Sequence, residues 1–319
     1  MTIAMVFPGQ GSQSQGMQAD LAAGFTEVAD VYAQASDIMG YDLWQLVQND
    51  PQGRLGETVV TQPAMLTAGY AAWRVWQSSG GAMPEQMAGH SLGEYTALVC
   101  AGAVSFADAL TVVRRRSELM QQAVPAGRGA MAAILGLDDD AMLAVCAQAA
   151  AGKVVDAVNF NAPGQVVIAG DKDAVNRAIE LAKEQGARRA LILPVSVPAH
   201  SSLMRAAGEA LQESLAAANF STPGIAVIAA SNATPYGDAQ DIRERLSRQV
   251  YSPVQWVNTV NAMITAGATS VIECGPGKVL AGLMRRIDKT TPCAFINSVD
   301  SLQDALQCEP IVHRSEENS

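Results

Sequence analysis

Cysteines are scarce in this sequence, and their spacing suits neither a disulfide framework nor a metal site. There are five, an odd number, and no two of them form a C-x-x-C pair. Disulfide frameworks use even sets of cysteines, and zinc sites use closely spaced pairs. The sequence therefore predicts reduced, mostly buried thiols and no bound metal.

Positive charge is also scarce. The 21 Lys and Arg residues are outnumbered by 31 Asp and Glu, which gives a formal net charge of −10. Nucleic-acid binding needs a broad basic face, so this charge balance argues against it. An anionic ligand must instead meet a local basic cluster. The two candidate clusters are Arg114, Arg115 and Arg116, and Lys278, Arg285, Arg286 and Lys289.

The sequence lacks a long hydrophobic run and a recognisable targeting segment. Met1–Gln10 has no basic residue ahead of its single short apolar run, which stops at Pro8. This pattern predicts neither a signal peptide nor a membrane span, and we expect a cytoplasmic protein. At the other end, residues 309–319 are polar and are predicted to be a frayed tail.

The pattern of apolar residues and turn residues predicts an α/β fold. Strands are expected at 3–7, from 86 to a turn at 91, at 225–229 and at 270–273. Helices are expected at 20–39, at 63–78 with Thr61 as N-cap, at 95–101, 105–123, 201–218, 241–249 and 254–266. We assign residues 1–125 and 196–308 to this larger domain.

Residues 126–195 have a different order of elements. The pattern reads strand, helix, strand, strand, helix, strand, which is the ferredoxin-like arrangement. A unit of this size is typical of one inserted subdomain. The sequence therefore predicts a large α/β domain interrupted by a small ferredoxin-like subdomain.

Gly89-His90-Ser91-Leu92-Gly93 is a G-x-S-x-G motif between a predicted strand and a predicted helix. In that context the motif forms a nucleophile elbow, a turn so tight that glycines must flank the serine. The serine then lies at the start of a helix, whose free N–H groups favour an anion. Ser91 is therefore a candidate nucleophile, and the Leu92 amide is suited to an oxyanion hole.

A serine hydroxyl needs a base, and the chain has three histidines to offer. His90 adjoins Ser91 on the strand side, where successive side chains point apart, and His313 lies in the predicted tail. By elimination, His200 is the candidate base. No carboxylate stands out as the third member of a triad, and a backbone carbonyl could orient the imidazole instead.

Five motifs in order resemble one known family. They are Pro8-Gly9-Gln10-Gly11, Gly89 to Tyr95, Val197-Pro198-Ala199-His200, Tyr251 to Trp256 and Gly275-Pro276-Gly277. With these motifs the chain closely resembles the malonyl-CoA:acyl carrier protein transacylases from about Ile3 to Asn297. The resemblance implies an α/β-hydrolase-like large domain with a ferredoxin-like insertion.

The family pattern implies a role for each matching residue. Ser91 matches the nucleophile and His200 the base, while the amides of Gln10 and Leu92 match the oxyanion hole. Gln249 matches the residue whose backbone carbonyl orients the histidine.

The resemblance also implies how the acyl group is held. Arg116 matches the arginine that binds the malonyl carboxylate, a choice among three adjacent arginines that composition could not make. Gln62 matches a residue near the pocket, with a structural role at the helix start as the alternative. Ala199 departs from the serine that commonly precedes the histidine, which removes a hydroxyl beside the acyl pocket.

The function implied is transfer of malonyl from malonyl-CoA to the phosphopantetheine thiol of acyl carrier protein through a malonyl-serine. This ping-pong reaction of fatty acid synthesis needs no cofactor besides its coenzyme A thioester substrate. Two alternatives remain: a malonyl transferase of a malonate decarboxylase or polyketide system, and a serine thioesterase or hydrolase. A relict scaffold is disfavoured because Ser91, His200 and Arg116 occur together.

Overall fold

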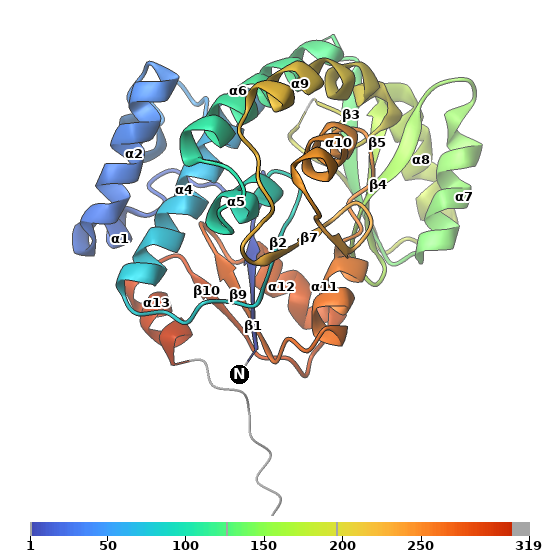
Figure 1. The fold of residues 1–319 in the computed structure, drawn as a ribbon. Helices are drawn as coiled ribbons and strands as arrows, with labels where there is room; N and C mark the ends of the chain where they lie inside the picture. The colour runs from blue at the N-terminus through green and yellow to red at the C-terminus, as the bar shows by residue number, and fades with distance from the viewer. Residues whose placement is uncertain (1, 126, 196, 308–319) are drawn as a thin grey trace, which may run out of the picture.

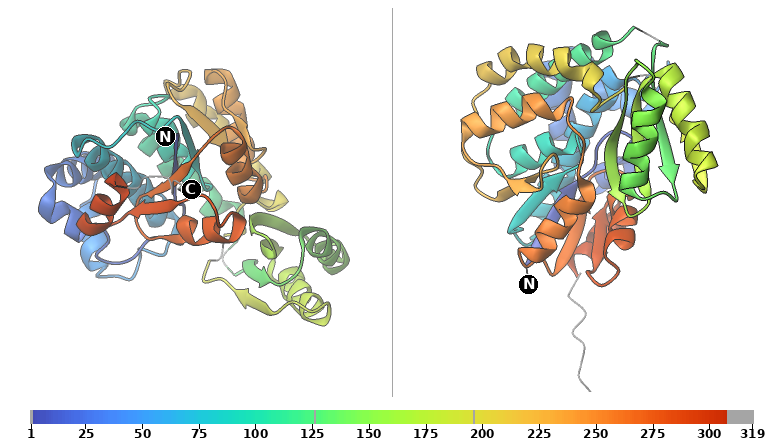
Figure 2. Two further views of the ribbon diagram at one scale, coloured as in Figure 1. Left: turned by 90° about the horizontal axis from the view of Figure 1, so that it is seen from below. Right: turned by 90° about the vertical axis from the view of Figure 1, so that its right-hand side faces the viewer.

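Two β-sheets of different size organise the chain (Figure 1). The computed structural model describes residues 2–125, 127–195 and 197–307. A six-stranded sheet forms the centre of the larger part, and a four-stranded sheet belongs to a lobe beside it, green to yellow in Figure 2. The tail predicted at 309–319 and His313 lie outside the described residues.

The large sheet is parallel except at one edge. Its order is β10-β9-β1-β2-β7-β8, and only β8 pairs antiparallel, with β7. Its strands are β1 (Ile3–Phe7), β2 (Gln86–Gly89), β7 (Ala226–Ala229), β8 (Thr234–Pro235), β9 (Ser270–Cys274) and β10 (Cys293–Ile296). Because β1 and β2 are parallel neighbours, the loops that follow them leave the sheet at the same edge.

Helices cover both faces of this sheet, so every residue of β1 is buried. Met5 packs into one hydrophobic cluster and Val6 into the other, on opposite faces of the strand. One face is covered by α11 (Trp256–Thr265) and α12 (Val279–Ile287). The helices of the opposite cluster are α1 (Ala19–Gly24), α2 (Thr26–Met39), α3 (Leu43–Asn49), α4 (Thr58–Ser78), α5 (Gly93–Cys100), α6 (Phe106–Ala123), α9 (Arg205–Ala217), α10 (Ala239–Gln249) and α13 (Val299–Leu306).

The small sheet has the ferredoxin-like topology that the sequence predicts. Its strands are antiparallel in the order β4-β5-β3-β6. The elements are β3 (Gly129–Leu135), α7 (Asp139–Ala150), β4 (Val155–Ala162), β5 (Gln165–Asp171), α8 (Lys172–Glu184) and β6 (Arg189–Ile192). Helices α7 and α8 pack on one face; the other face carries Met131 and Val158, which belong to a separate small cluster. Residues 126–195 remain our proposal for the bounds of this subdomain.

Three local predictions differ from the structure. The helix predicted at 20–39 is divided into α1 and α2 by Phe25, whose extended backbone (φ −139°) stops the first helix. The predicted N-cap Thr61 lies inside α4, which begins at Thr58, and its hydroxyl donates to the Leu55 carbonyl at 2.6 Å. The helix predicted from Ser201 starts as the short 3-10 turn η1 (Ser202–Met204).

Within the part of the chain that is described, no helix combines the length and the apolar character needed to cross a membrane. The same residues contain no group of three or more His, Cys, Asp or Glu side chains arranged to hold a metal ion. Four cysteines are described, and three of them, Cys100, Cys146 and Cys274, are buried.

Candidate active site

Ser91 lies in the turn between β2 and α5 with a left-handed backbone, φ 54°. The two flanking glycines explain how the chain reaches this conformation. A Cβ at Gly93 would lie 2.0 Å from the Phe7 carbonyl oxygen, and one at Gly89 would lie 1.8 Å from the carbonyl carbon of Gly93. Because no side chain fits at either position, β1, β2 and α5 pack closely and leave Ser91 at the turn.

The Oγ of Ser91 lies 2.7 Å from the Nε2 of His200. The opposite ring nitrogen, Nδ1, lies 2.8 Å from the Gln249 carbonyl oxygen and 3.1 Å from that of Ser252. Carbonyl oxygens only accept hydrogen bonds, so we assign the proton of the neutral ring to Nδ1, which leaves Nε2 to accept from the serine. In this arrangement a main-chain carbonyl occupies the position that an aspartate takes in a conventional triad.

His200 is 4% exposed and has a left-handed backbone, φ 66°. Burial lowers the pKa of its imidazole to about 3, and the nearby positive charge of Arg116 adds to this effect. The ring is therefore neutral near pH 7, as a general base must be.

Arg116 lies on α6 with its guanidinium directed at the same serine. Its Nη2 donates to Ser91 Oγ at 3.3 Å and to Gln249 Oε1 at 3.0 Å, and its Nη1 donates to Gln62 Oε1 at 2.5 Å. The side chain is 1% exposed, and no carboxylate among the described residues forms an ion pair with it. Burial lowers its pKa, but an arginine stays charged in proteins. A buried cation held by neutral oxygens can bind an incoming carboxylate.

The structure distinguishes Arg116 from Arg114 and Arg115 by the burial of its side chain, a distinction that composition alone could not make. Arg114 and Arg115 are about half exposed, and both form ion pairs with Glu118 on the outer side of α6. Helical geometry turns adjacent residues to different faces, so one of the three arginines points inward.

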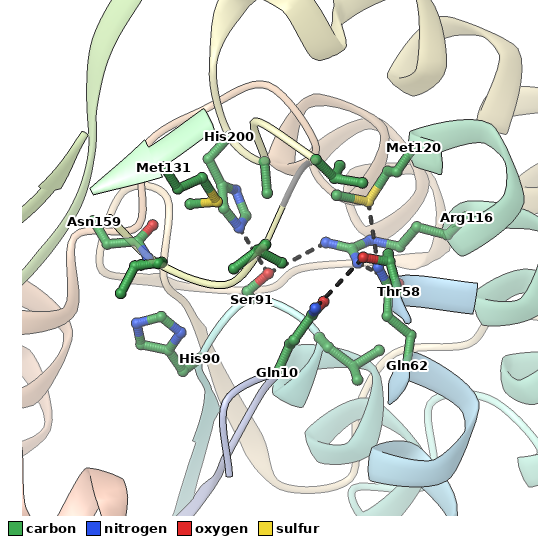
Figure 3. Close-up of a pocket in the computed structure, with 15 residues that line it drawn as sticks. Gln10, Thr58, Gln62, His90, Ser91, Arg116, Met120, Met131, Asn159 and His200 are labelled. Carbon is green, nitrogen blue, oxygen red and sulfur yellow. Dashed lines mark hydrogen bonds between the residues drawn. The ribbon is translucent and has the colours of Figure 1, made fainter. Parts of the chain in front are cut away.

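A cavity of about 110 Å³ joins these groups (Figure 3). Gln10 and Leu92 line it, as the oxyanion-hole hypothesis requires, and Gln62 reaches it from α4 beside Arg116. Ala199, next to His200, also lines it. The apolar part of the wall is formed by Leu92, Met120, Met131, Leu193, Val195, Val197 and Ala199.

Two asparagines near the site, Asn159 and Asn161, were not singled out from the sequence, which considered His90 only to exclude it as the base. His90 lines the cavity, but its Nε2 lies 2.8 Å from Asn161 Oδ1, and its ring contacts that of Trp256. Asn159 lines the same wall, and its side-chain oxygen is buried without a hydrogen-bond partner in the described structure. The two asparagines lie on β4 of the small sheet, whose approach to Ser91 depends on the tertiary fold and leaves no local signal.

Comparisons with known proteins identify the family of this chain. Residues 4–305 match the family model of the acyl transferase domain. The malonyl CoA-acyl carrier protein transacylase of Salmonella typhimurium is 52% identical over 303 residues, which cover 95% of this chain and 98% of that protein. The chain belongs to this transacylase family. The resemblance found in the sequence motifs is thereby confirmed.

Solved structures of malonyltransferases have the same fold. The acyl carrier protein S-malonyltransferase of Vibrio cholerae superposes with a TM-score of 0.93 at 53% identity, covering 95% of this chain and 99% of that one. A malonyl-transacylase in complex with a type II PKS acyl-carrier protein gives a TM-score of 0.95 at 50% identity, covering 96% and 99%. The predicted transacylase fold, a large α/β unit with a ferredoxin-like insertion, is confirmed.

Proposed function

We propose that this enzyme transfers a malonyl group from malonyl-CoA to the phosphopantetheine thiol of an acyl carrier protein, with Ser91 as the covalent carrier. One observation supports this most directly. The Ser91 hydroxyl lies 2.7 Å from the His200 base and 3.3 Å from the buried cation of Arg116. A nucleophile therefore has a carboxylate-binding group beside it, as transfer of a carboxylated acyl group requires.

The first half-reaction forms the acyl-enzyme. His200 Nε2 takes the proton of Ser91 as the oxygen attacks the thioester carbonyl, and the amides of Gln10 and Leu92 receive the developing oxyanion. The intermediate collapses with cleavage of the carbon–sulfur bond, and the proton held by His200 goes to the leaving coenzyme A thiolate. The Gln249 carbonyl, 2.8 Å from Nδ1, stabilises the transient imidazolium.

The second half-reaction reverses these steps with a new thiol. His200 accepts the proton of the carrier-protein thiol, whose sulfur attacks the malonyl-serine ester, and then returns the proton to Ser91 Oγ. All the bond changes are acyl and proton transfers, so we propose that the chemistry needs no cofactor other than the thioester substrate.

Arg116 explains the preference for malonyl over acetyl in this proposal. A guanidinium can donate two parallel hydrogen bonds to a carboxylate. An acetyl group offers no such acceptor and leaves the buried cation without an anionic partner, so only a malonyl group gains these hydrogen bonds. Gln62 and Gln249 hold the guanidinium in place through their side-chain oxygens.

The second basic cluster is our candidate for docking an acidic carrier protein. Lys278 precedes α12, and Arg285 and Arg286 lie in its last turn. Arg286 donates to Gln165 of the small sheet at 2.6 Å, so this helix end lies beside the small lobe. Reversing the charges of Lys278, Arg285 and Lys289 is expected to raise the KM for carrier protein and to leave the KM for malonyl-CoA unchanged. An unchanged carrier-protein KM would remove this surface from the proposal.

A partition assay separates the transferase from the main alternative, a serine hydrolase. The enzyme is incubated with malonyl-CoA in the presence and absence of carrier protein, and malonate and malonyl-carrier are both quantified. We expect malonyl-carrier as the main product and little malonate without the acceptor. Rapid release of malonate in the absence of any thiol acceptor would favour the thioesterase.

A further inference from the structure

Glu94 is a buried carboxylate to which the reaction scheme above gives no role. It lies in the first turn of α5, three positions after the nucleophile, and is 0% exposed. Its Oε1 accepts from Gln249 Nε2 at 2.9 Å, and its Oε2 accepts from the Tyr236 hydroxyl. No arginine or lysine of the described structure forms an ion pair with it. Burial of a carboxylate without a cation partner is costly, so its presence under the active site needs an explanation.

The explanation lies in the side chain of Gln249. Its Nε2 donates both to the Ser91 carbonyl oxygen at 2.8 Å and to Glu94 Oε1. Both partners accept hydrogen bonds, so the NH₂ end of the amide must face them. The oxygen end then faces the opposite way, where it accepts from Arg116 Nη2 at 3.0 Å.

The orientation of this amide matters because its two ends are chemically opposite. If the amide turned over, it would direct N–H groups at the guanidinium, which can only donate. Arg116 would lose one of the three side-chain oxygens that accept from it, the other two being Gln62 Oε1 and Ser91 Oγ. Together with the Ser91 carbonyl, Glu94 is thus placed to fix the orientation of Gln249, which touches the arginine, while Glu94 itself does not touch the arginine.

We propose that Glu94, held by Tyr236, is a positioning residue for acyl selectivity: it fixes the Gln249 amide so that Arg116 is aligned for a carboxylated acyl group. This inference rests on the proposed function. A carboxylate that formed an ion pair with Arg116 would compete with the carboxylate of the substrate. Glu94 avoids this competition because it contacts Gln249 and not Arg116.

The test is a double-mutant cycle read as the ratio of kcat/KM for malonyl-CoA to that for acetyl-CoA. Glu94→Leu removes the acceptor and is expected to lower this ratio about tenfold, the effect of losing one hydrogen bond to a charged group. Gln249→Leu, which keeps the backbone carbonyl for His200, is expected to lower it by a similar factor. The double variant is expected to match Gln249→Leu alone, because Glu94 acts through Gln249.

Two controls make the cycle specific. Glu94→Gln keeps an oxygen that can face Gln249, so the ratio is expected to return to within about threefold of wild type. Glu118→Gln removes a carboxylate from the outer side of α6 and is expected to leave the ratio unchanged. If Glu94→Leu does not fold, Tyr236→Phe takes its place in the cycle; it removes a donor to Glu94 and is expected to lower the ratio only when Gln249 is present.

The outcomes separate this inference from the proposed function. A wild-type enzyme that shows no preference for malonyl-CoA would contradict the proposed function itself. Two results would overturn only the role of Glu94. One is a malonyl preference that stays intact in Glu94→Leu. The other is a double variant in which the fold-decrease of the ratio equals the product of the two single decreases.

Discussion

Ser91 and His200 meet at 2.7 Å although 109 positions separate them, and both have left-handed backbones, with φ of 54° and 66°. Non-glycine residues adopt this conformation at a cost in free energy, and they keep it where the surrounding structure enforces it. The backbone conformation of Ser91 is held by the close packing around Gly89 and Gly93. That of His200 is held by its own amide, which donates to the Val250 carbonyl at 3.0 Å, and by the Gln249 carbonyl that accepts from Nδ1.

The rate of malonyl-enzyme formation is expected to stay level as the pH falls from about 8 to about 5. Burial lowers the pKa of His200 from 6.5 to about 3, so the free enzyme keeps a neutral base over this range. Rapid-mixing measurements of coenzyme A release at limiting malonyl-CoA would check this. A decline centred near 6.5 would show that the imidazole titrates as an ordinary histidine.

The same shift makes a prediction for stability. The unfolded chain binds a proton at this imidazole below its ordinary pKa of 6.5, while the folded chain does not until about 3. The contribution of His200 to the free energy of unfolding is therefore complete above pH 6.5 and is lost as the pH falls towards 3. His200→Gln, compared with wild type by denaturant titration at several pH values, is expected to lose less stability on acidification. Parallel losses in the two proteins would contradict the assignment.

Arg116→Ala is expected to lower kcat/KM for malonyl-CoA about a hundredfold. The value of kcat/KM for acetyl-CoA is expected to stay the same or to rise, because only the malonyl group loses hydrogen bonds to a charged group. Arg115→Ala is the matched control, because Arg115 is exposed and pairs with Glu118 on the same helix. Steady-state kinetics with both thioesters would decide. An equal decrease in kcat/KM with malonyl-CoA and acetyl-CoA would mean that Arg116 supports the structure of the site but does not bind the malonyl carboxylate.

The packing of the elbow can be tested with two glycine substitutions. Gly93→Ala is expected to lower the free energy of unfolding by about 3 kcal/mol, since its Cβ would lie 2.0 Å from the Phe7 carbonyl oxygen. Gly282→Ala, at an exposed position of α12 with nothing within 4 Å, is expected to raise it by about 0.5 to 1 kcal/mol. Denaturant titrations of both variants measure these changes. A fully stable Gly93→Ala protein would show that the three elements do not pack as described.

The parts of the site that the sequence could predict are those with a local signal. Ser91 lies in a motif whose glycines, strand and helix are all adjacent in the chain, and the sequence predicts His200 as the base because the other two histidines are badly placed.

The contacts formed by tertiary packing had no such signal. In our proposal the orientation of Gln249 depends on Glu94, which lies 155 positions away in the sequence. Glu94 is in turn held by Tyr236, which lies 142 positions from it. Asn161 reaches His90 only because β4 of the small sheet lies against the elbow. Spacing in the sequence carries no information about either contact.

The elements missed from the sequence were mostly short or lacked a clear period. The sequence pattern predicts neither α3 (Leu43–Asn49) nor the three elements after residue 277, which are α12, β10 and α13. Strand β10 has only four residues, and three of them are only partly buried, so its apolar pattern is weak. The sequence predicts too late a start for α4 because Pro63, a residue favoured in a first helical turn, lies inside the helix.

Intact-mass spectrometry after brief mixing with malonyl-CoA tests the central claim most directly. The wild-type enzyme is expected to gain the mass of one malonyl group, and this adduct is expected to disappear on addition of carrier protein. Ser91→Ala is expected to gain nothing under the same conditions. A malonyl adduct that persists in Ser91→Ala, or a wild-type enzyme that transfers malonyl without ever carrying it, would contradict the covalent role of Ser91.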